Sequence, residues 1–317
     1  MIKSNSSDSG EISQPLISVI MNCYNSEKYL QEAIDSVLAQ TYQNLEIIFW
    51  DNQSSDKSQE IVKSIKDDRI KYFLSQSHTT LGEARNLAME KANGEYISFL
   101  DCDDVIASRK IELQVIEFQK DKSLGLVYCN GARIDHNGCV KTSFYKKRKP
   151  SGNIFRKTLS SYDLYIPAVM FRKDCIIKKG IKFNERFRFI EEYDFFLRIL
   201  KSFTAKYIDR KLAFWRVHDK SNTWKHYNEF INERNIFLQI FFSSDEKIKF
   251  QKEINSIKDL NTFQYSLVSW KEGDNLTSRN AIKKIKTRKL KYFITYLAMF
   301  FDFKVLYPLL CRIKYIK

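Results

Sequence analysis

The first hundred residues alternate short apolar runs with helical patterns, and this alternation restricts the fold more than any other feature. After the first run, Leu30, Ala33, Ile34, Val37 and Leu38 recur at the spacing of one helix face. Strands that alternate with helices form right-handed βαβ units and a mostly parallel sheet. We therefore predict an α/β fold with a Rossmann-like sheet flanked by helices, whose first strands are residues 17–23, 45–50, 70–74 and 95–100.

Beyond residue 109 the alternation is less regular. Helical patterns cover 111–119 and 192–202, and we expect strands at 124–130, at 164–171 and as a pair around 205–217. From Trp224 the pattern is helical and increasingly basic.

These changes of pattern suggest three parts. We expect a polar N-terminal tail at 1–15, a main α/β domain at 16–222 and a basic helical region at 223–317. The tail lacks the apolar core of a signal peptide, and the six cysteines include no Cys-x-x-Cys pair. The sequence therefore predicts a cytoplasmic protein with reduced thiols, and it argues against a zinc ribbon or a disulfide-stapled domain.

The formal net charge of +15 is unevenly distributed. Residues 279–317 contain eleven Lys or Arg against a single acid, and 141–157 contain seven Lys or Arg and no acid. Basic patches attract phosphate groups in nucleotides, lipids or nucleic acids. The chain carries no DNA- or RNA-recognition signature and most of its excess charge lies in an apolar tail, so we expect no nucleic-acid partner.

Acidic side chains follow two of the predicted strands. Asp51 comes directly after the second strand, and Asp101, Asp103 and Asp104 follow the fourth. In a parallel sheet these turns meet at the edge where ligands bind. Carboxylates held this close repel one another, and Mg²⁺ or Mn²⁺ relieves the repulsion and binds a diphosphate. The alternative is a helix cap at Asp103 or Asp104, with the remaining acids in solvent.

Two segments resemble family 2 glycosyltransferases. Residues 16–58 (LISVIMNCYNSEKYLQEAIDSVLAQTYQNLEIIFWDNQSSDKS) resemble the opening of that family, and 82–104 (GEARNLAMEKANGEYISFLDCDD) resemble the segment that leads into its Asp-x-Asp motif. The resemblance rests on ordered motifs, which is more specific than one short pattern. It implies a GT-A fold in which 16–104 bind a nucleotide-sugar and 105–222 form the acceptor side, with a C-terminal helical extension.

The resemblance also implies a nucleotide pocket at the first two turns. Asn22, Tyr24 and Asn25 match the turn that lines the nucleotide in the family. Asp51 and Asn52 match a frequent Asp-Asp pair whose second member meets the base. The side-chain oxygen of Asn52 can accept a hydrogen bond from N3–H of uracil as Asp would.

The same resemblance places three more residues near the donor. Arg85 matches a basic residue that faces the nucleotide, with a surface ion pair as the alternative. Asp101 would hold the ribose or the sugar and contribute to the metal site. Asp103 would be the principal ligand of Mn²⁺ or Mg²⁺.

Residues 185–199 (ERFRFIEEYDFFLRI) resemble the Glu-Asp-Tyr-Asp stretch that begins a later helix of the family. Glu192 then matches the base that deprotonates the acceptor hydroxyl, with Glu191 as the alternate. Acids are also favourable in the first turn of any helix, which is the competing interpretation.

Residues 214–221 (FWRVHDKS) resemble an aromatic-Arg-x-His stretch on the loop that closes over the donor. This match implies that Arg216 neutralises the leaving diphosphate and that His218 ligates the metal or contacts a phosphate. A structural role for His218 is the alternative.

Together these features predict an inverting, metal-dependent glycosyltransferase. The expected donor is a UDP-hexose or UDP-N-acetylhexosamine, and the expected acceptor is a glycan or a polyprenyl-linked oligosaccharide of bacterial surface-glycan assembly. A nucleotidyltransferase is the weaker alternative, because the turn after the first strand lacks glycine and arginine. Two rival classes are a basic nucleic-acid-binding protein and a non-catalytic scaffold that keeps the fold.

The C-terminal residues 288–317 combine large apolar side chains with Lys and Arg. Their longest apolar stretch is shorter than the roughly 20 residues that span a bilayer. We therefore expect 279–317 to associate with an anionic membrane surface, which places the protein on the inner face of the bacterial cell membrane. Helix packing on the main domain and pairing with a second copy are the alternatives.

Overall fold

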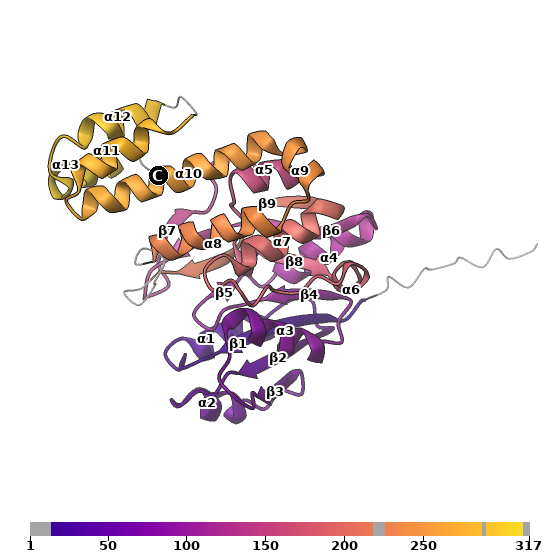
Figure 1. The fold of residues 1–317 in the computed structure, drawn as a ribbon. Coiled ribbons are helices and arrows are strands. Elements are labelled where there is room, and N and C mark those ends of the chain that lie inside the picture. The colour runs from indigo at the N-terminus through magenta and orange to yellow at the C-terminus, as the bar shows by residue number, and fades with distance from the viewer. Residues whose placement is uncertain (1–13, 218–225, 287–289, 313–317) are drawn as a thin grey trace, which may run out of the picture.

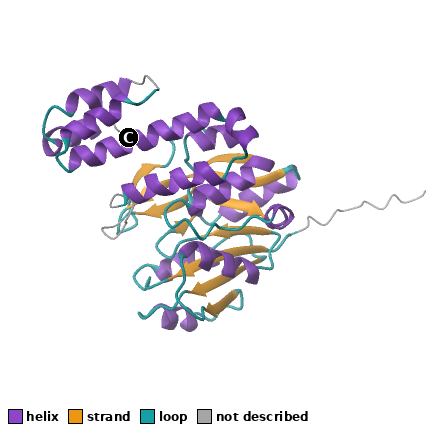
Figure 2. Ribbon diagram, viewed as in Figure 1, coloured by secondary structure: helices purple, strands orange, loops and turns teal. Residues whose placement is uncertain are grey.

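The computed structural model of the chain describes residues 14–217, 226–286 and 290–312. A central sheet crosses the molecule, with helices on both of its sides (Figure 2). Within the described residues the sheet has nine strands in the order β3-β2-β1-β4-β8-β6-β9-β5, and β7 pairs with β6. The strands are β1 (Ile17–Cys23), β2 (Leu45–Asp51), β3 (Ile70–Leu74), β4 (Tyr96–Phe99), β5 (Val105–Ile106), β6 (Leu124–Ile134), β7 (Val140–Ser143), β8 (Val169–Arg172) and β9 (Thr204–Arg216).

The helices connect the strands and continue beyond the last one (Figure 1). They are α1 (Leu30–Leu38), α2 (Ser58–Ser64), α3 (Leu81–Lys91), α4 (Lys110–Lys120), α5 (Phe155–Ser160), α6 (Lys173–Lys179), α7 (Glu191–Ser202), α8 (Tyr227–Ile240), α9 (Ser244–Lys249), α10 (Gln251–Lys271), α11 (Asn275–Lys283), α12 (Leu290–Ala298) and α13 (Phe303–Arg312), with a short 3₁₀ turn at Ile166–Ala168.

The predicted α/β fold is confirmed. Strands β3, β2, β1 and β4 are parallel neighbours joined by α1, α2 and α3, as the alternation of apolar runs and helical patterns indicates. β8 then lies antiparallel between β4 and β6, while β6 and β9 are again parallel. The carboxyl ends of β1, β2 and β4 therefore meet at one edge, where ligands bind in open sheets of this kind.

Alternate residues of the strands supply two separate cores. On β2, Ile47 packs with α1, α2 and α4 on one face, whereas Ile48 packs with α3, α5, α6 and α7 on the other. The same alternation recurs on β1 with Val19 and Ile20. Side chains of successive strand residues point to opposite faces, so these largely buried strands require helices on both sides.

Two sequence expectations differ from the structure. The strand pair expected around 205–217 is one long strand, β9, which bulges against β6 where Asp209, Arg210 and Lys211 are exposed. That polar triplet has the composition of a turn. The strand expected at 164–171 begins only at Val169, because Pro167 lies in the 3₁₀ turn and has no N–H for a ladder.

The C-terminal helices extend the core on one side. Phe237 of α8 and Ile254 of α10 pack into the same core as α7, and α10 then leads away from the sheet (Figure 1). Beyond it, α11, α12 and α13 pack on the second half of α10 around Trp270, Tyr292 and Met299. The expected helical extension is thus present, and its first helices belong to the main core.

Candidate active site

Hydrogen bonds join the turn after β1 to the turn after β2. Asn25, with φ 50°, accepts a hydrogen bond from the backbone N–H of Ser55 at 2.8 Å, and its own N–H donates to Oγ of Ser54. Gln53, with φ 71°, is the other non-glycine residue with positive φ in the described chain. Such backbone conformations concentrate at functional sites when neighbouring contacts hold them.

The residues predicted to meet the nucleotide base lie together at these turns. Asp51 is buried and accepts hydrogen bonds from the Ser54 N–H and the Tyr72 hydroxyl, both at 2.8 Å. The side chain of Asn52 is occupied by the protein, because its amide binds the backbone of Thr79 through both its oxygen and its nitrogen. In this arrangement Asn52 holds the segment that carries His78 and Thr79.

The ring of Tyr24 lies 4.2 Å from the ring of His78, centroid to centroid. Tyr24 is exposed, and the amide nitrogen of nearby Asn22 is shielded from solvent without a hydrogen-bond partner. Aromatic rings of this kind stack well on nucleobases. His78 is not among the residues predicted from the sequence, because no motif marks it and only the fold brings it to Tyr24.

The acidic turn after β4, residues 101–104, has an outward and an inward part. Asp101 lines the main cavity with 40% of its side chain exposed, and Asp103 is half-buried. Asp104 is buried, and its Oδ1 accepts a hydrogen bond from the backbone N–H of Arg216 at 2.8 Å, while Oδ2 has no protein partner. Burial and the charges of Asp103 and Asp101 raise the pKa of Asp104 well above its usual value.

Arg216 lies behind this turn and holds it in place. Its guanidinium is 1% exposed and lies 4.4 Å from the ring of Tyr29. It donates to the Asp103 carbonyl at 2.8 Å and pairs with Glu32 at 2.7 Å, and it also donates to the carbonyl oxygens of Asp135 and His136. These contacts support a structural role in the acidic turn, and the predicted contact with a diphosphate remains a prediction.

Arg85 joins the acidic turn to α7. Its guanidinium, also 1% exposed, lies 3.1 Å from a carboxylate oxygen of Glu191, 3.1 Å from one of Glu192 and 3.5 Å from one of Asp101. The rings of Phe99 and Phe183, which pack edge to face on each other, lie against it. The structure thus places Arg85 between the two acids predicted as bases and the acid predicted to meet the donor.

This buried arrangement alters the ionisation of Glu192. Burial raises its pKa to about 8, Arg85 opposes the shift, and the charges of Glu191 and Asp101 add to it. Burial likewise raises the pKa of Glu191, although Arg85 again opposes the change. A carboxylate with a raised pKa is a better proton acceptor, which suits a general base.

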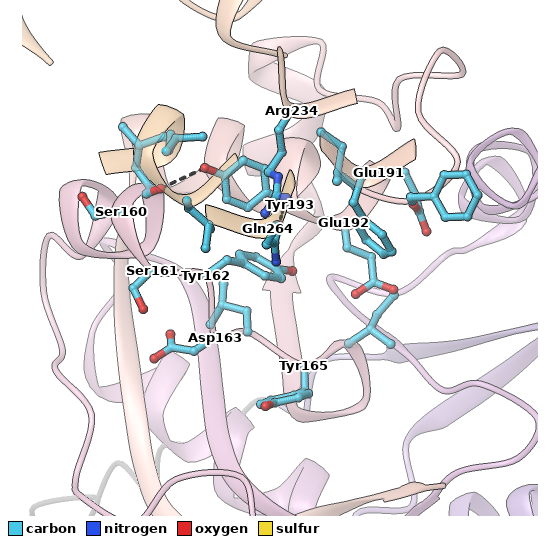
Figure 3. A pocket seen from close by; sticks show the side chains of 18 of the residues that line it. Ser160, Ser161, Tyr162, Asp163, Tyr165, Glu191, Glu192, Tyr193, Arg234 and Gln264 are labelled. Carbon is cyan, nitrogen blue, oxygen red and sulfur yellow. Dashed lines mark hydrogen bonds between the residues drawn. The ribbon is translucent and has the colours of Figure 1, made fainter. Parts of the chain in front are cut away.

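Glu192 opens onto a cavity of about 930 Å³. The side chain of Glu192 is 26% exposed, whereas that of Glu191 is 7% exposed. In Figure 3, Glu192 lies at the side of the cavity and Tyr162, Tyr165 and Asp163 lie below Arg234 and Gln264. The lining comes from the acidic turn, from α7, from α8 and α10 and from the start of α12.

Glu233 on α8 fixes the start of α7, a role that no sequence motif indicates. Its buried carboxylate accepts hydrogen bonds from the backbone N–H groups of Arg188, Phe189 and Ile190, at 2.8, 2.9 and 3.1 Å. These residues directly precede Glu191 and Glu192. A single acid within a charged helix forms no motif, so its role becomes visible only when α8 is packed on α7.

We expect Glu233→Gln to lower kcat about tenfold while the protein stays folded, because one amide replaces the charged acceptor of three N–H groups. The weaker hydrogen bonds would loosen residues 188–190, the segment that orients Glu192. Turnover and circular dichroism measure the two effects. Glu229→Gln, an exposed position on the same helix, is the control, and equal kcat values for both variants would contradict this positioning role.

The donor set of the acidic turn fits a hard divalent cation. Asp101 and Asp104 line the cavity, Oδ2 of Asp104 is buried without a protein partner, and half-buried Asp103 lies between them in the chain. Oxygen ligands are those that Mg²⁺ and Mn²⁺ prefer. No three His, Cys, Asp or Glu side chains group as a complete metal site in residues 14–217, 226–286 and 290–312. His218, the third predicted ligand, lies outside the described residues.

Solved structures share the fold of this chain. TarS of S. aureus, in complex with UDP-GlcNAc, has the same fold with a TM-score of 0.64 at 18% identity, over 85% of this chain and 81% of that one. A mannosyltransferase of Pyrobaculum calidifontis, in complex with GDP-Man and Mn²⁺, superposes with a TM-score of 0.62 at 14% identity, over 93% and 84%. These likenesses show that the chain has the GT-A fold.

Sequence similarity identifies the family to which the chain belongs. The model of glycosyl transferase family 2 matches residues 18–178. A glycosyltransferase of Methanocaldococcus jannaschii is 30% identical over 264 residues, which are 82% of this chain and 89% of that protein. The Escherichia coli UDP-Glc:α-D-GlcNAc-diphosphoundecaprenol β-1,3-glucosyltransferase WfgD is 37% identical over 125 residues, 39% of this chain and 49% of WfgD. The chain belongs to glycosyl transferase family 2.

Proposed function

We propose that the protein is an inverting glycosyltransferase that uses Glu192 as its base. The observation that carries this proposal is the bridge from Asp101 through Arg85 to Glu192 at one end of the cavity. Glu192 takes the proton of an acceptor hydroxyl, and that hydroxyl displaces the nucleotide diphosphate from the donor sugar in one step. Inversion follows from a single displacement.

The donor lies at the carboxyl ends of β1, β2 and β4. Asn22, Tyr24, Asn25, Asp51 and Asn52 surround the nucleotide, with the base beside Tyr24 and His78. UDP is supported by the complex of TarS with UDP-GlcNAc and by the name of WfgD, which specifies UDP-Glc. Residues 16–104 thus form the nucleotide-sugar part and 105–222 contribute the acceptor side.

A divalent cation belongs to this proposal. Asp103 and Asp101 would hold it, with His218 as the third predicted ligand, and the Mn²⁺ complex of the Pyrobaculum mannosyltransferase supports its use. When bound, the cation stabilises the charge that develops on the leaving diphosphate. Arg85 keeps Asp101 and Glu192 together beside it.

The acceptor occupies the cavity of about 930 Å³, which is large for a single sugar. Aromatic side chains from Tyr162, Tyr165 and Trp215 line it and provide faces for sugar rings. The name of WfgD specifies an undecaprenyl-diphosphate-linked acceptor, which supports an acceptor of the same kind in bacterial surface-glycan assembly.

Donor turnover tests the proposal directly. With Mn²⁺ and a panel of nucleotide-sugars, we expect one UDP-sugar to release UDP, and EDTA to abolish the release. Asp103→Ala should lower turnover at least about a hundredfold, because it removes the principal metal ligand. Asp35→Ala, on the exposed side of α1, is the control. Full activity in EDTA, or in Asp103→Ala, would contradict the metal site.

An apolar face of the last helices supports membrane association. Leu290, Phe293 and Leu297 are exposed on one side of α12, and Phe301 and Val305 are exposed just beyond it. The surrounding segment is strongly basic. Within the described residues, every helix is too short or too polar to cross a bilayer. Apolar side chains flanked by cations suit the interface of an anionic membrane.

We expect the protein to sediment with vesicles that contain phosphatidylglycerol and to stay in solution with phosphatidylcholine alone. The double variant F293D/L297D should lower the partition coefficient about tenfold or more, since it places charge on the apolar face. Ile248→Asp, at an exposed apolar position on α9, is the control. Sedimentation velocity checks the alternative, because a dimer lost in F293D/L297D would mean that a second copy covers this face.

A further inference from the structure

Arg234 is a cation of the cavity wall that the proposed chemistry does not use. It lies on α8, its guanidinium donates to the side-chain oxygen of Gln264 on α10, and both residues line the cavity. Its Nε is shielded from solvent and has no hydrogen-bond partner. Figure 3 shows Arg234 and Gln264 together above Tyr162, on the same cavity as Glu192.

No carboxylate among the described residues forms an ion pair with Arg234. Burial lowers its pKa to about 10, and the groups that oppose this shift are the hydroxyls of Tyr193 and Tyr227. A largely buried guanidinium with only neutral partners is costly, since buried charges are normally paired. The two fully buried arginines of this site, Arg85 and Arg216, both have carboxylate partners.

The neighbours of Arg234 lead to two other parts of the cavity wall. Tyr193, the residue that follows the proposed base in α7, lies close enough to act on the charge of Arg234. Gln264 follows Phe263 on α10, whose ring centroid lies 4.9 Å from that of Tyr292 on α12, and Lys291 and Tyr292 also line the cavity. The exposed apolar face of α12 begins at Leu290 and Phe293.

This order matches the order of groups in a lipid-linked acceptor: sugar, diphosphate, lipid. We infer that Arg234, held by Gln264, binds the diphosphate of a polyprenyl-diphosphate-linked acceptor whose sugar meets Glu192 and whose lipid leaves past α12. The inference rests on the proposed function. An arginine fork suits phosphate oxygens because it donates two parallel hydrogen bonds.

The proposed position of the donor diphosphate differs from that of Arg234. The donor lies at the carboxyl ends of β1 and β4, where Asp101 is joined through Arg85 to Glu191 and Glu192, whereas Arg234 lies on α8 and contacts α10. An anion at Arg234 is therefore part of the ligand on the acceptor side. A neutral glycan would leave this cation without a counter-charge.

Calorimetric binding of farnesyl diphosphate, inorganic pyrophosphate and farnesol to the full chain tests the inference, with UDP and Mn²⁺ present to fill the donor site. Farnesyl diphosphate should bind the wild type. Arg234→Gln should lower this affinity about ten- to a hundredfold, because the charge-assisted hydrogen bonds to the diphosphate are lost. Arg234→Lys should recover part of the affinity. Arg210→Gln, an exposed arginine on β9, should bind like the wild type.

The outcomes separate this inference from the proposed function. The inference about Arg234 would be overturned if the wild type and Arg234→Gln bound farnesyl diphosphate with equal affinity while both proteins unfolded at similar midpoint temperatures. Pyrophosphate that binds as tightly as farnesyl diphosphate, with the same loss in Arg234→Gln, would overturn the lipid-linked source. UDP binding is expected to be equal in both proteins. A failure of both to bind UDP would count against the proposed function, and the comparison of farnesyl diphosphate binding could still be interpreted. If Arg234→Gln does not fold, Arg234→Lys and Gln264→Leu carry the comparison, and undiminished binding in both would overturn the inference.

Discussion

Replacing Glu192 with glutamine is expected to lower kcat about a thousandfold, because the amide cannot accept the proton of the acceptor hydroxyl. Glutamine keeps the length of the side chain and leaves Asp101 and the nucleotide turns unchanged. The affinity for UDP should therefore stay within a factor of about two. Turnover of a donor with its acceptor and calorimetric titration of UDP measure the two quantities in the same preparations.

Glu185→Gln provides a matched control, since Glu185 is an exposed glutamate a few residues before α7. Glu191→Gln distinguishes the two candidates for the base. Glu191 is nearly buried and faces Arg85, so its replacement should act through the arrangement of Arg85 and lower kcat less than the replacement of Glu192. A larger loss in Glu191→Gln than in Glu192→Gln would transfer the role of base to Glu191.

The pH dependence provides a second measure of the same assignment. Burial raises the pKa of Glu192 to about 8, with Arg85 opposing the shift and Glu191 and Asp101 adding to it, while the Tyr162 hydroxyl faces the same space. The base acts as the carboxylate, so kcat/KM should rise about tenfold per pH unit below that pKa and level off above it. In Glu192→Gln this limb should disappear. A wild-type profile already flat at about pH 6 would exclude Glu192 as the titrating group.

The gathering of acidic side chains at one edge of the sheet could be predicted because its determinants are local. The first four strands are short, mostly apolar runs; Asp51 ends the second of them and Asp101 follows the fourth. Strand and turn are adjacent in the chain, and parallel strands bring successive turns to one edge. The position of Asp101 on the cavity wall follows from that rule.

The partners of these residues could not be predicted, because they are distant in the chain. Arg216 reaches the acidic turn only because β9 pairs with β5, which follows that turn directly. Glu233 reaches the start of α7 only because α8 folds back over the core. In both cases a single charged residue carries the contact, and charged residues are frequent in this sequence.

Asn52 shows a further limit of motif matching. Its position in the chain matches a residue that meets the nucleotide base, but its amide is occupied by Thr79. The loop at 76–80 has no motif of its own, so its contact with Asn52 could not be foreseen. The ring of His78, placed against Tyr24 by that loop, is the stronger structural candidate for contact with the base.

Replacing Arg85 with methionine is expected to cost about 3 kcal/mol in the free energy of unfolding, because it leaves Asp101, Glu191 and Glu192 together without a cation. For a chain of this size the loss corresponds to a fall of roughly 5 °C in the midpoint of thermal unfolding. Arg109→Met is the control, because Arg109 forms an exposed pair with Glu112 on the surface of α4. Exposed pairs contribute at most about 1 kcal/mol, so its midpoint should change by a few degrees or less.

The loss in Arg85→Met should also depend on pH in a defined direction. Without Arg85 the raised pKa of Glu192 rises further, because the group that opposed the shift is gone. A carboxyl group with a raised folded pKa destabilises the protein increasingly as pH climbs from its unfolded pKa towards its folded pKa. The difference in midpoint between the wild type and Arg85→Met should therefore be larger at about pH 9 than at about pH 6. A difference that is equal at both pH values would mean that Arg85 stabilises the site through its packing against Phe99 and Phe183 rather than through its charge.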